Sequence, residues 1–516
     1  MKLLDKLIKI FSENKKLYAT RIIASVPVVA MVVIASISFY SAPLTYDEAY
    51  NLQVSVNLAE HGEYATNGSV YDGQPKQFDT YISTGPTLLI PIAFMFKLFG
   101  VDVWQFRFVM NIIFISFCVL TVWMLLKATR DSQFSNTDKY LRGLLAVSLA
   151  SAYLFGSFTS KGGSFFSMAL GEPLGLCLII LSVILLQYKK PNSAALVLGL
   201  AILTKFIFIL FIPFFIIELY SKHKDKFRIS SLWKTLTTFF VVCIPVVVFE
   251  IYKFIAMGLD ISLYKANLKE FASFFNSSGG DPSTPYTPLQ IVIDRLSNIN
   301  NFDQSSSGII SFFVFGLAML AVSWFFIYIY KNSRLIINRE SFNKFNVPFI
   351  YILGSIGLWF FWWTFISSTS LERYIAAPLA IVLIAVITLA YIKIPISKKA
   401  FNFILIILIS VLSFFAVYNN KTTPSLSIQR EESRRIVNLY GQRDIYNFGW
   451  WQNPEILFLS SRTSTPYDFY NTKPGEYWVL TSKLQQALNK KGYDDSMTLC
   501  DSVIDLGYYR ICQINI

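Results

Sequence analysis

The stretch IIASVPVVAMVVIASISFYSAPLTYDEAY (residues 22–50) decides the fold. Its first twenty residues are almost wholly apolar, and the acidic pair Asp47 and Glu48 follows soon after them. A helix needs about 20 apolar residues to cross roughly 30 Å of hydrocarbon, and this run is too long for the core of a secretory signal peptide. The stretch therefore predicts a membrane-spanning helix that delivers two carboxylates to a membrane surface.

The composition of the whole chain predicts a polytopic α-helical membrane protein. Of its 516 residues, 54% are hydrophobic and only 15% are charged, whereas soluble domains carry about 25% charged residues. So much apolar surface also excludes an intrinsically disordered chain. The net charge of +13 could suggest nucleic acid, but the basic residues fall in short segments between apolar runs, so nucleic-acid binding is not expected.

Apolar runs of span length recur along the chain. Together with residues 22–41, they fall at residues 104–126, 141–158, 168–188, 235–257, 308–330, 347–366, 373–394 and 399–418. Two further runs do not fit a single span: residues 86–99 are too short, and residues 192–220 are too long and contain Lys205.

Charge decides how these two runs are arranged. An excess of lysine and arginine marks cytoplasmic segments, and it is found in residues 1–21, 127–142, 189–190, 221–230, 331–346 and 393–399. If all six are cytoplasmic, residues 86–99 form a helix along the outer surface and residues 192–220 cross twice as paired short helices. The prediction is eleven spans, with the N-terminus inside and the C-terminus outside. A short tilted span at residues 86–99 is the alternative.

The predicted organisation has three parts. Residues 1–21 form a basic cytoplasmic N-terminus. Residues 22–418 form a transmembrane catalytic domain with external loops at residues 42–103 and 258–307. Residues 419–516 lose the membrane composition and are expected to form a small extracytoplasmic α/β domain.

The last part contains strand-like runs and a pair of cysteines. EYWVL (476–480) and YYRICQINI (508–516) have the composition of strands, with a polar helical stretch, SKLQQALNKKG, between them. Cys500 and Cys512 fall in the same part, and two cysteines in an oxidising compartment suggest a disulfide. Two unpaired buried thiols are the alternative.

Acidic candidate residues gather in the segments expected near the outer surface. Asp47 lies at the membrane–water boundary, where a partly desolvated carboxylate can act as a base. Thr45 and Glu48 have the spacing of a capping box, so Glu48 is either a second acid of the site or only a cap. Glu172 lies inside a predicted span, where an ionisable residue is a functional candidate, unless it reaches the lipid headgroups.

Basic residues accompany these acids on the same predicted face. Lys161 lies in the external turn before the fourth span, and Lys205 lies at the outer turn of the paired helices, where it meets a phosphate or simply snorkels. Arg373, beside Tyr374, offers bidentate phosphate recognition, unless an ion pair with Glu372 only holds the loop. A base with phosphate-binding cations at a lipid boundary indicates transfer of a group from a phosphate carried on a lipid.

The sequence contains no motif of a nucleotide-binding or metalloprotease site and no internal repeat. With only two histidines in the chain, a histidine-rich metal site is not available. No metal and no cofactor is expected.

The chain resembles the GT-C superfamily of glycosyltransferases that use polyprenyl-phosphate sugars. The most similar groups are the protein O-mannosyltransferase-like, aminoarabinose transferase-like and galacturonosyltransferase-like enzymes. The matching pieces are TYDEAYNLQVSVNLAEHGEY (45–64), STGPTLLIPIAFMFKLFGVDVWQFRF (83–108), ALGEPLGLCLIILSVILL (169–186), GLAILTKFIFILFIP (199–213) and ERYIAAPLA (372–380). They cover much of the first 220 residues and the connection before the tenth span.

The resemblance assigns roles to the candidate residues. It implies that Asp47 is catalytic, with Glu48 beside it, and that Lys205 and Arg373 hold the lipid phosphate. Glu172 corresponds to the acidic residue of the next external region. Tyr374 and Lys161 are expected to assist in substrate binding.

The chain departs from the family pattern at one position. Aminoarabinose transferases usually carry a lysine just before the proline that opens the surface helix, whereas this chain has Thr84 and Gly85 before Pro86. This departure puts a phosphate contact at that point, and aminoarabinose as the sugar, in doubt. An acidic pair of the kind that oligosaccharyltransferases use with a metal is also missing at residues 159–167, so metal-independent catalysis is expected.

The predicted function is inverting transfer of a monosaccharide from a polyprenyl-phosphate carrier to a cell-envelope acceptor. The acceptor is expected to be lipid A or another envelope glycan, on the extracytoplasmic face of a bacterial inner membrane. Protein O-glycosylation, transport of a lipid-linked sugar by a flippase, and a glycan ligase with a pyrophosphate-linked donor are the alternatives.

Overall fold

The computed structural model describes most of the first 276 residues and scattered parts of the remainder. The described residues are 15–67, 76–128, 165–221, 229–276, 348–365, 376–382, 384, 426–440, 445–447, 454–460, 477–481, 500–506 and 509–514, with isolated helical positions between 139 and 154.

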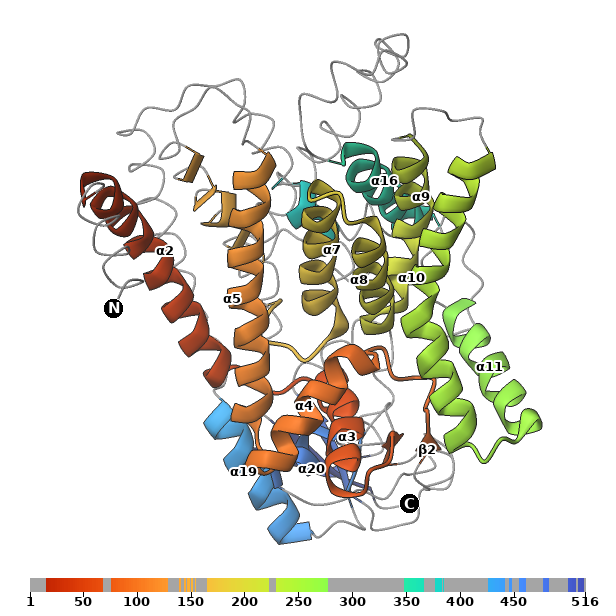
Figure 1. The fold of residues 1–516 in the computed structure, drawn as a ribbon. Helices are drawn as coiled ribbons and strands as arrows, with labels where there is room; N and C mark the ends of the chain where they lie inside the picture. The colour runs from red at the N-terminus through yellow and green to blue at the C-terminus, as the bar shows by residue number, and fades with distance from the viewer. Residues whose placement is uncertain are drawn as a thin grey trace.

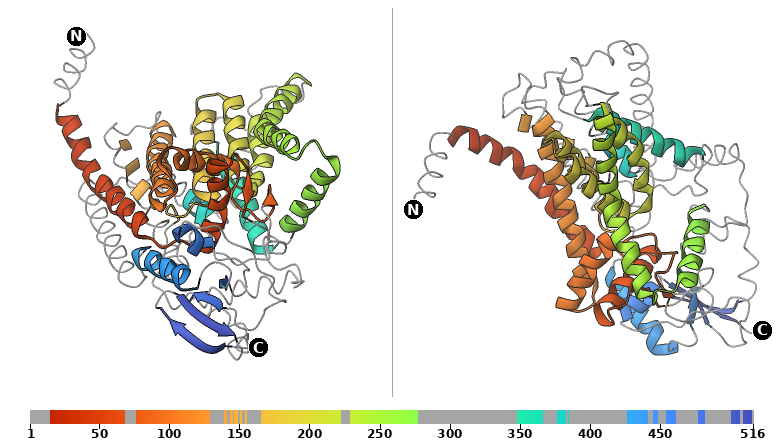
Figure 2. Two further views of the ribbon diagram at one scale, coloured as in Figure 1. Left: turned by 90° about the horizontal axis from the view of Figure 1, so that it is seen from below. Right: turned by 45° about the vertical axis from the view of Figure 1, so that its right-hand side comes forward.

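Most described helices stand side by side as a bundle (Figures 1 and 2). They are α2 (Lys15–Ser41), α5 (Val103–Ala128), α7 (Gly171–Gln187), α8 (Pro191–Thr204), α9 (Ile212–Ser221), α10 (Ile229–Ala256) and α16 (Phe349–Phe365). Helix α7 packs between α5 and α8, α10 packs on α8, and α16 packs on α9.

The surfaces of α5 and α10 support a membrane protein. Within the described residues, these two helices are long and apolar enough to cross a bilayer, and shorter apolar helices stand beside them. Large apolar side chains of α10, including Phe240, Val248 and Ile255, are exposed along its length. An exposed apolar surface of this extent suits the hydrocarbon of a bilayer. Several predicted spans, such as residues 308–330 and 399–418, lie outside the described residues, so the count of eleven stays a prediction.

The short run at residues 86–99 forms helix α4 (Pro86–Phe99), as predicted. Pro86 occupies the first turn, and Gly100 ends the helix with a φ of +82°, a conformation that suits glycine. The helix lies at one end of the bundle against α3 (Tyr46–Glu60) (Figure 1). Its Ile92 side is buried and its Phe94 side is exposed.

The long run at residues 192–220 is broken at Lys205, as the paired-helix prediction requires. Helix α8 ends at Thr204, Lys205 has an extended backbone (φ −159°, ψ 126°), and the 3₁₀ turn η2 (Phe206–Phe211) leads into α9. The break carries Lys205 to the same end of the bundle as the first turn of α7, where the two chain segments touch.

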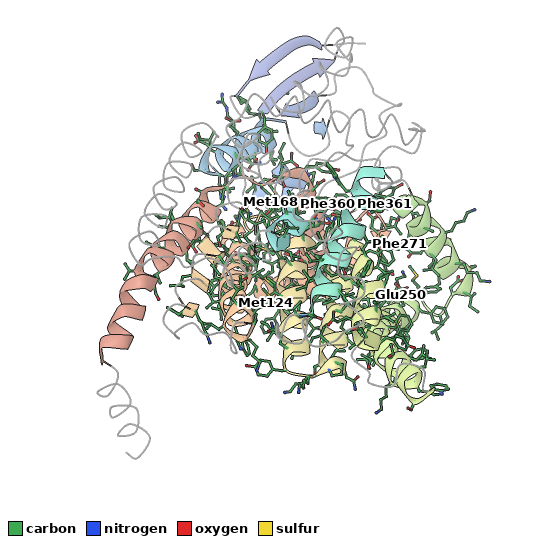
Figure 3. The ribbon with its side chains drawn as sticks, turned by 90° about the horizontal axis from the view of Figure 1, so that it is seen from above. Met124, Met168, Glu250, Phe271, Phe360 and Phe361 are labelled. Atoms are coloured by element: carbon green, nitrogen blue, oxygen red, sulfur yellow. The ribbon has the colours of Figure 1, made fainter. Side chains whose placement is uncertain are left out.

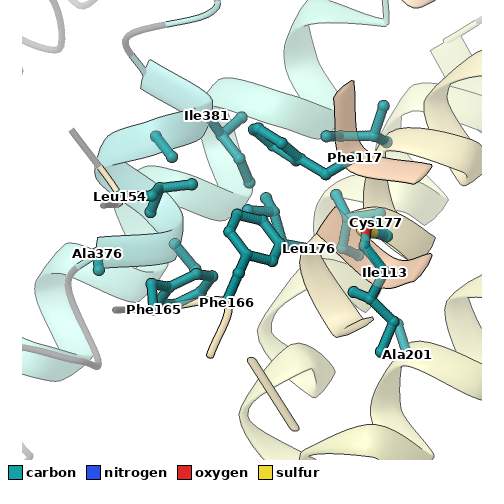
Figure 4. Packing of buried hydrophobic residues seen from close by; sticks show 14 of the residues in the cluster. Ile113, Phe117, Leu154, Phe165, Phe166, Leu176, Cys177, Ala201, Ala376 and Ile381 are labelled. Carbon is teal, nitrogen blue, oxygen red and sulfur yellow. The ribbon is translucent and has the colours of Figure 1, made fainter. Parts of the chain in front are cut away.

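The interior of the bundle is filled by aromatic and aliphatic side chains. Phe117 of α5 packs on Phe166 with ring centroids 5.1 Å apart, and Leu176 and Cys177 of α7 lie beside them (Figure 4). The view along the bundle shows side chains such as Met124 and Phe360 filling the space between helices, with Glu250 at the edge (Figure 3). This packing fixes where the helix ends lie, and hence where the polar residues meet.

A small sheet lies at the end of the bundle that carries α3 and α4 (Figure 2). Its order is β3 (Ile445–Asn447), β4 (Tyr477–Thr481), β6 (Tyr509–Ile514), β5 (Cys500–Asp505), with β3 and β4 parallel and the other pairs antiparallel. Strands β4 and β6 fall on the two runs predicted as strands. Helices α19 (Leu426–Tyr440) and α20 (Pro454–Ser460) share a hydrophobic cluster with β6. The stretch at 482–492 lies outside the described residues.

Basic residues of the described connections gather at the opposite end of the bundle. The ammonium of Lys127, near the end of α5, lies 4.1 Å from the ring centre of Tyr188, and Lys189 and Lys190 follow in the turn between α7 and α8. This separation agrees with the predicted charge asymmetry. Which end faces the cytoplasm stays a prediction.

Candidate active site

The first turn of α3 forms from a local sequence signal. Glu48 Oε2 accepts the backbone N–H of Thr45 at 3.4 Å, and the Thr45 side chain caps the helix in return. This is the capping box that the sequence predicted. It fixes the start of α3, and with it the direction of the Asp47 side chain in the first turn.

Glu48 also forms a buried ion pair with Arg107 of α5. The Nη1–Oε1 distance is 2.6 Å, and both side chains are fully buried. Glu48 Oε1 further accepts the N–H of Ala169 at 2.9 Å, and Arg107 donates to the carbonyl oxygens of Ala42 and Ser167. Both carboxylate oxygens are therefore occupied. This geometry favours a positioning role for Glu48, holding α3, α5 and the start of α7 together, over the catalytic role expected beside Asp47.

Sequence reasoning missed Arg107, although a signal was present. The residue lies inside the apolar run at 104–126, and an arginine within a predicted span is costly unless it is paired. The same rule singled out Glu172. Applied to Arg107, it would have called for a buried acidic partner such as Glu48.

Asp47 is half-buried and has a second carboxyl group as a neighbour. Helix α20 packs on α3, and Glu455 of α20 is 4% exposed, with its Oε2 atom lacking any hydrogen-bond partner. Burial, and next the nearby charge of Asp47, raise the pKa of Glu455 to about 7. Glu455 therefore holds its proton more tightly than an exposed glutamate does. No feature of the sequence PEILFLS (454–460) pointed to this neighbour.

Lys205 and Glu172 form the second ion pair of the site. Their side chains are in direct contact and almost fully buried, and Glu172 Oε2 has no hydrogen-bond partner. The extended backbone of Lys205 turns its side chain toward the first turn of α7. The sequence had placed both residues near one face, but it did not predict that they bind each other.

A junction of two glycines brings the chain segments of the site together. The N–H of Gly85 donates to the carbonyl of Thr204 at 2.8 Å. A Cβ atom on Gly85 would lie 1.7 Å from the Leu203 oxygen, and one on Gly171 would lie 2.2 Å from the Thr204 oxygen. The starts of α4 and α7 therefore meet the end of α8 beside Lys205. The same contact explains why this chain has no lysine directly before Pro86: any side chain there would collide with α8.

Three expected substrate-binding residues, Lys161, Arg373 and Tyr374, lie outside the described residues, and their roles stay predictions. The backbone around the two cysteines is described: Cys500 is paired with Ile514, and Cys512 with Val503. The cysteines are thus not directly opposite each other, and their disulfide stays a prediction.

The described part of the chain holds no group of three or more histidine, cysteine, aspartate or glutamate side chains able to bind a metal. The carboxyl groups are instead divided between arginine, lysine and a neighbouring acid. The arrangement can accept a proton at Asp47 and present a buried ammonium at Lys205. Metal-independent catalysis stays a prediction.

Comparisons with known proteins identify the fold. No family model matches the chain, and no curated protein matches its sequence. ArnT from Cupriavidus metallidurans, solved in the apo state and bound to undecaprenyl phosphate, has a TM-score of 0.51 at 11% identity. The match covers 94% of this chain and 96% and 97% of the two ArnT chains. An oligosaccharyltransferase, AglB from Archaeoglobus fulgidus, matches with a TM-score of 0.45 at 12% identity over 93% of this chain and 73% of that chain. The similarity to ArnT shows that the chain has the GT-C fold expected from its sequence.

Proposed function

We propose that this protein is an inverting glycosyltransferase that moves a monosaccharide from a polyprenyl-phosphate carrier to an acceptor in the cell envelope. The observation that carries the proposal is the Lys205–Glu172 ion pair, held by the Gly85 and Gly171 contacts at the end of the bundle that also bears Asp47. A buried ammonium and a carboxylate at the boundary of apolar helices suit a phosphate that is attached to a lipid. The fold it shares with ArnT, which has been solved with undecaprenyl phosphate bound, supports this donor class.

The phosphate of the donor binds Lys205. To reach the ammonium, it takes the place of the Glu172 carboxylate, whose second oxygen is already without a partner. In the predicted arrangement Arg373 adds a second cation. As the bond between the anomeric carbon and the phosphate oxygen breaks, these cations stabilise the negative charge that collects on the departing phosphate.

Asp47 accepts the proton of the acceptor hydroxyl. The hydroxyl oxygen attacks the anomeric carbon from the side opposite the phosphate, and the new glycosidic bond forms with inversion. Asp47 receives the proton, and polyprenyl phosphate leaves with the bonding electron pair.

The acceptor is proposed to be lipid A or another envelope glycan at the extracytoplasmic surface. The support is the position of the site at one end of the apolar bundle, where α4 turns an exposed apolar side outward. A lipid-borne acceptor can approach such a site from the plane of the bilayer.

The test is Asp47→Asn in the full-length protein. Mass spectrometry of envelope glycolipids from a deletion strain first identifies the missing product, and each variant is then expressed at equal level to restore it. We expect Asp47→Asn to lower product formation at least about 100-fold, because the base is lost. Glu60→Gln is the matched control, since Glu60 is an exposed carboxylate at the far end of α3, and it should restore product fully.

Retained turnover in Asp47→Asn would remove the assignment of Asp47 as the base. Purified protein reconstituted in vesicles separates the rival activities. Movement of a lipid-linked sugar across the bilayer without a new glycosidic bond would favour a flippase, and turnover of pyrophosphate-linked donors alone would favour a glycan ligase.

A further inference from the structure

We infer that Asn51, Thr80 and Thr84 form a subsite that binds hydroxyl groups of the transferred sugar. The inference rests on the proposed glycosyltransferase function and adds the part of the donor that these residues contact. The three side chains come from α3 and from the segment that leads into α4.

The observation behind this subsite is a set of buried polar atoms without partners. Asn51 is 1% exposed, and neither its amide nitrogen nor its amide oxygen has a hydrogen-bond partner. The hydroxyls of Thr80 (5% exposed) and Thr84 (1% exposed) are also unpartnered. Leaving such a group unpaired costs about 1–3 kcal/mol, and native proteins contain few of them. A ligand that supplies the missing partners accounts for all three.

Asn51 lies on the same row of α3 as the proposed base. Asp47, Asn51 and Ser55 recur every four residues, so they line one side of the helix. The Ser55 hydroxyl donates to the carbonyl of Leu89 in α4 at 3.0 Å, which turns this row toward the first half of α4. Asn51 therefore lies in the row of α3 that leads from Asp47 to the contact with α4.

The segment carrying Thr80 and Thr84 is held in place at both ends. Asp79 accepts hydrogen bonds from the Tyr50 hydroxyl at 2.7 Å and from the Thr66 hydroxyl at 2.9 Å. Tyr50 directly precedes Asn51 and Asp79 directly precedes Thr80, so this bond holds the start of the segment against α3. At the other end, Gly85 is bonded to Thr204, directly before Lys205. The segment that carries Thr80 and Thr84 thus runs from α3, which bears the proposed base, to the residue directly before the proposed phosphate-binding lysine, and the sugar of the donor must sit between those two groups.

The chemistry of the three groups matches a neutral polyol rather than an anion. An amide offers donors and an acceptor, and a threonine hydroxyl can donate and accept. Adjacent hydroxyls of a pyranose offer the same mixture. None of the three side chains carries a charge, so the phosphate is left to Lys205, and the hydroxyl pattern of the sugar decides which donor satisfies the subsite.

The test separates the sugar from its carrier. The unfolding temperature of the purified full-length protein is measured alone, with undecaprenyl phosphate, and with undecaprenyl phosphate carrying mannose, glucose or galacturonic acid. For the wild type we expect at least one glycosylated lipid to raise this temperature more than undecaprenyl phosphate does. In Asn51→Leu and Thr84→Val this extra rise should be lost, with about tenfold weaker binding of that lipid, while the rise with undecaprenyl phosphate is kept.

Thr121→Val is the matched control. Thr121 in α5 is another buried hydroxyl without a partner, but it lies toward the C-terminal end of α5, away from the end that follows α4. It should leave the sugar-dependent rise intact. Asn51→Leu should also unfold at the same or a higher temperature without ligand, since it removes two unpaired polar atoms.

Two results would overturn the subsite. One is a full sugar-dependent rise in both variants, as expected if an internal water satisfies these atoms. The other is a wild type that responds equally to bare and glycosylated lipid. In both cases the response to undecaprenyl phosphate survives, and so does the proposed donor class. A wild type that responds to none of the lipids would overturn the proposed function itself, together with the subsite.

Discussion

At the scale of single residues, the three glutamates of the site lie in different surroundings. Glu48 is neutralised by Arg107, Glu172 is paired with Lys205, and Glu455 has a neighbouring acid in place of a cation. Burial raises the pKa of Glu48 as well, but Arg107 lies beside that carboxylate, whereas burial and the nearby charge of Asp47 raise the pKa of Glu455 to about 7. Glu455 is therefore the residue whose protonation should change within the physiological range.

Glu455→Gln tests this directly through the pH dependence of stability. The pKa of Glu455 is raised to about 7 in the folded protein, above the value of about 4.3 for an unfolded glutamate. The folded state then binds the proton more tightly, so its stabilisation is full below about pH 4 and is lost as the pH rises toward 7. Glu455→Gln cannot ionise and should be more stable than the wild type at pH 8, on the order of 2 kcal/mol.

Thermal unfolding of both proteins at pH 5 and pH 8 checks this expectation. The difference between them should be small at pH 5 and should grow at pH 8. Parallel pH profiles would mean that Glu455 does not titrate in this range.

Residue-level prediction from the sequence reached positions whose signal is local: the capping box at Thr45 and the break at Lys205 are where the sequence placed them, while the roles of Asp47 and Lys205 stay predictions. Asp47 follows a span and Lys205 interrupts an apolar run, so each stands out from its neighbours in the chain. Glu455 does not, because its relation to Asp47 exists only after α20 packs on α3, some four hundred positions away in sequence. Arg107 stands out only as a charged residue inside an apolar run, and its partner Glu48 is 59 positions away in sequence.

At the scale of elements, the break between α8 and η2 determines the position of Lys205. The chain can turn there because the ends of α4, α7 and α8 approach so closely that two positions admit only glycine. Apolar run lengths and loop charges predicted the break and the helix at residues 86–99. They did not predict the contact between them, which depends on atoms from three separate helices.

Gly85→Ala should push the start of α4 away from the end of α8. The added methyl group would meet the Leu203 carbonyl oxygen, which is fixed in a helix and cannot move away cheaply. Overpacking of this kind costs about 1–3 kcal/mol, and the displaced end of α8 should also lower transfer activity. Thermal unfolding and product formation are the measurements.

Gly357→Ala is the control for this substitution. Gly357 lies in α16 with open space around its Cα, so alanine there should be neutral or slightly stabilising. Equal effects of the two substitutions would show that the junction is not tightly packed.

At the scale of the whole molecule, helix α19 near the C-terminus is hydrogen-bonded to the segment that precedes α3. Gln429 of α19 is fully buried. Its amide oxygen accepts the N–H of Leu44 at 2.7 Å, and its amide nitrogen donates to the Leu44 carbonyl at 2.9 Å. The same nitrogen donates to the Tyr509 hydroxyl of β6 at 3.1 Å. The C-terminal elements thereby hold the backbone three residues before Asp47.

Gln429→Ala should loosen that backbone. It leaves the N–H and C=O of Leu44 unpaired in a buried place, which costs about 1–3 kcal/mol for each group. We expect a lower unfolding temperature and a fall of about tenfold or more in the proposed turnover, because the proposed base Asp47 would no longer be held in position.

Asn438→Ala on the same helix is the control, since Asn438 is an exposed amide. It should change neither the unfolding temperature nor the turnover. An unaltered turnover in Gln429→Ala would show that the C-terminal elements do not position the first turn of α3.

The resting partner of Lys205 has a consequence for the catalytic cycle. If the carrier phosphate binds this ammonium as proposed, it enters by exchange with a built-in competitor, the Glu172 carboxylate. The Glu172 carboxylate is still present after the sugar has been transferred, so it can pair with the Lys205 ammonium again and displace the polyprenyl phosphate. The proposed enzyme would then bind its donor less tightly but release the product carrier faster, and accumulated carrier would inhibit it only weakly.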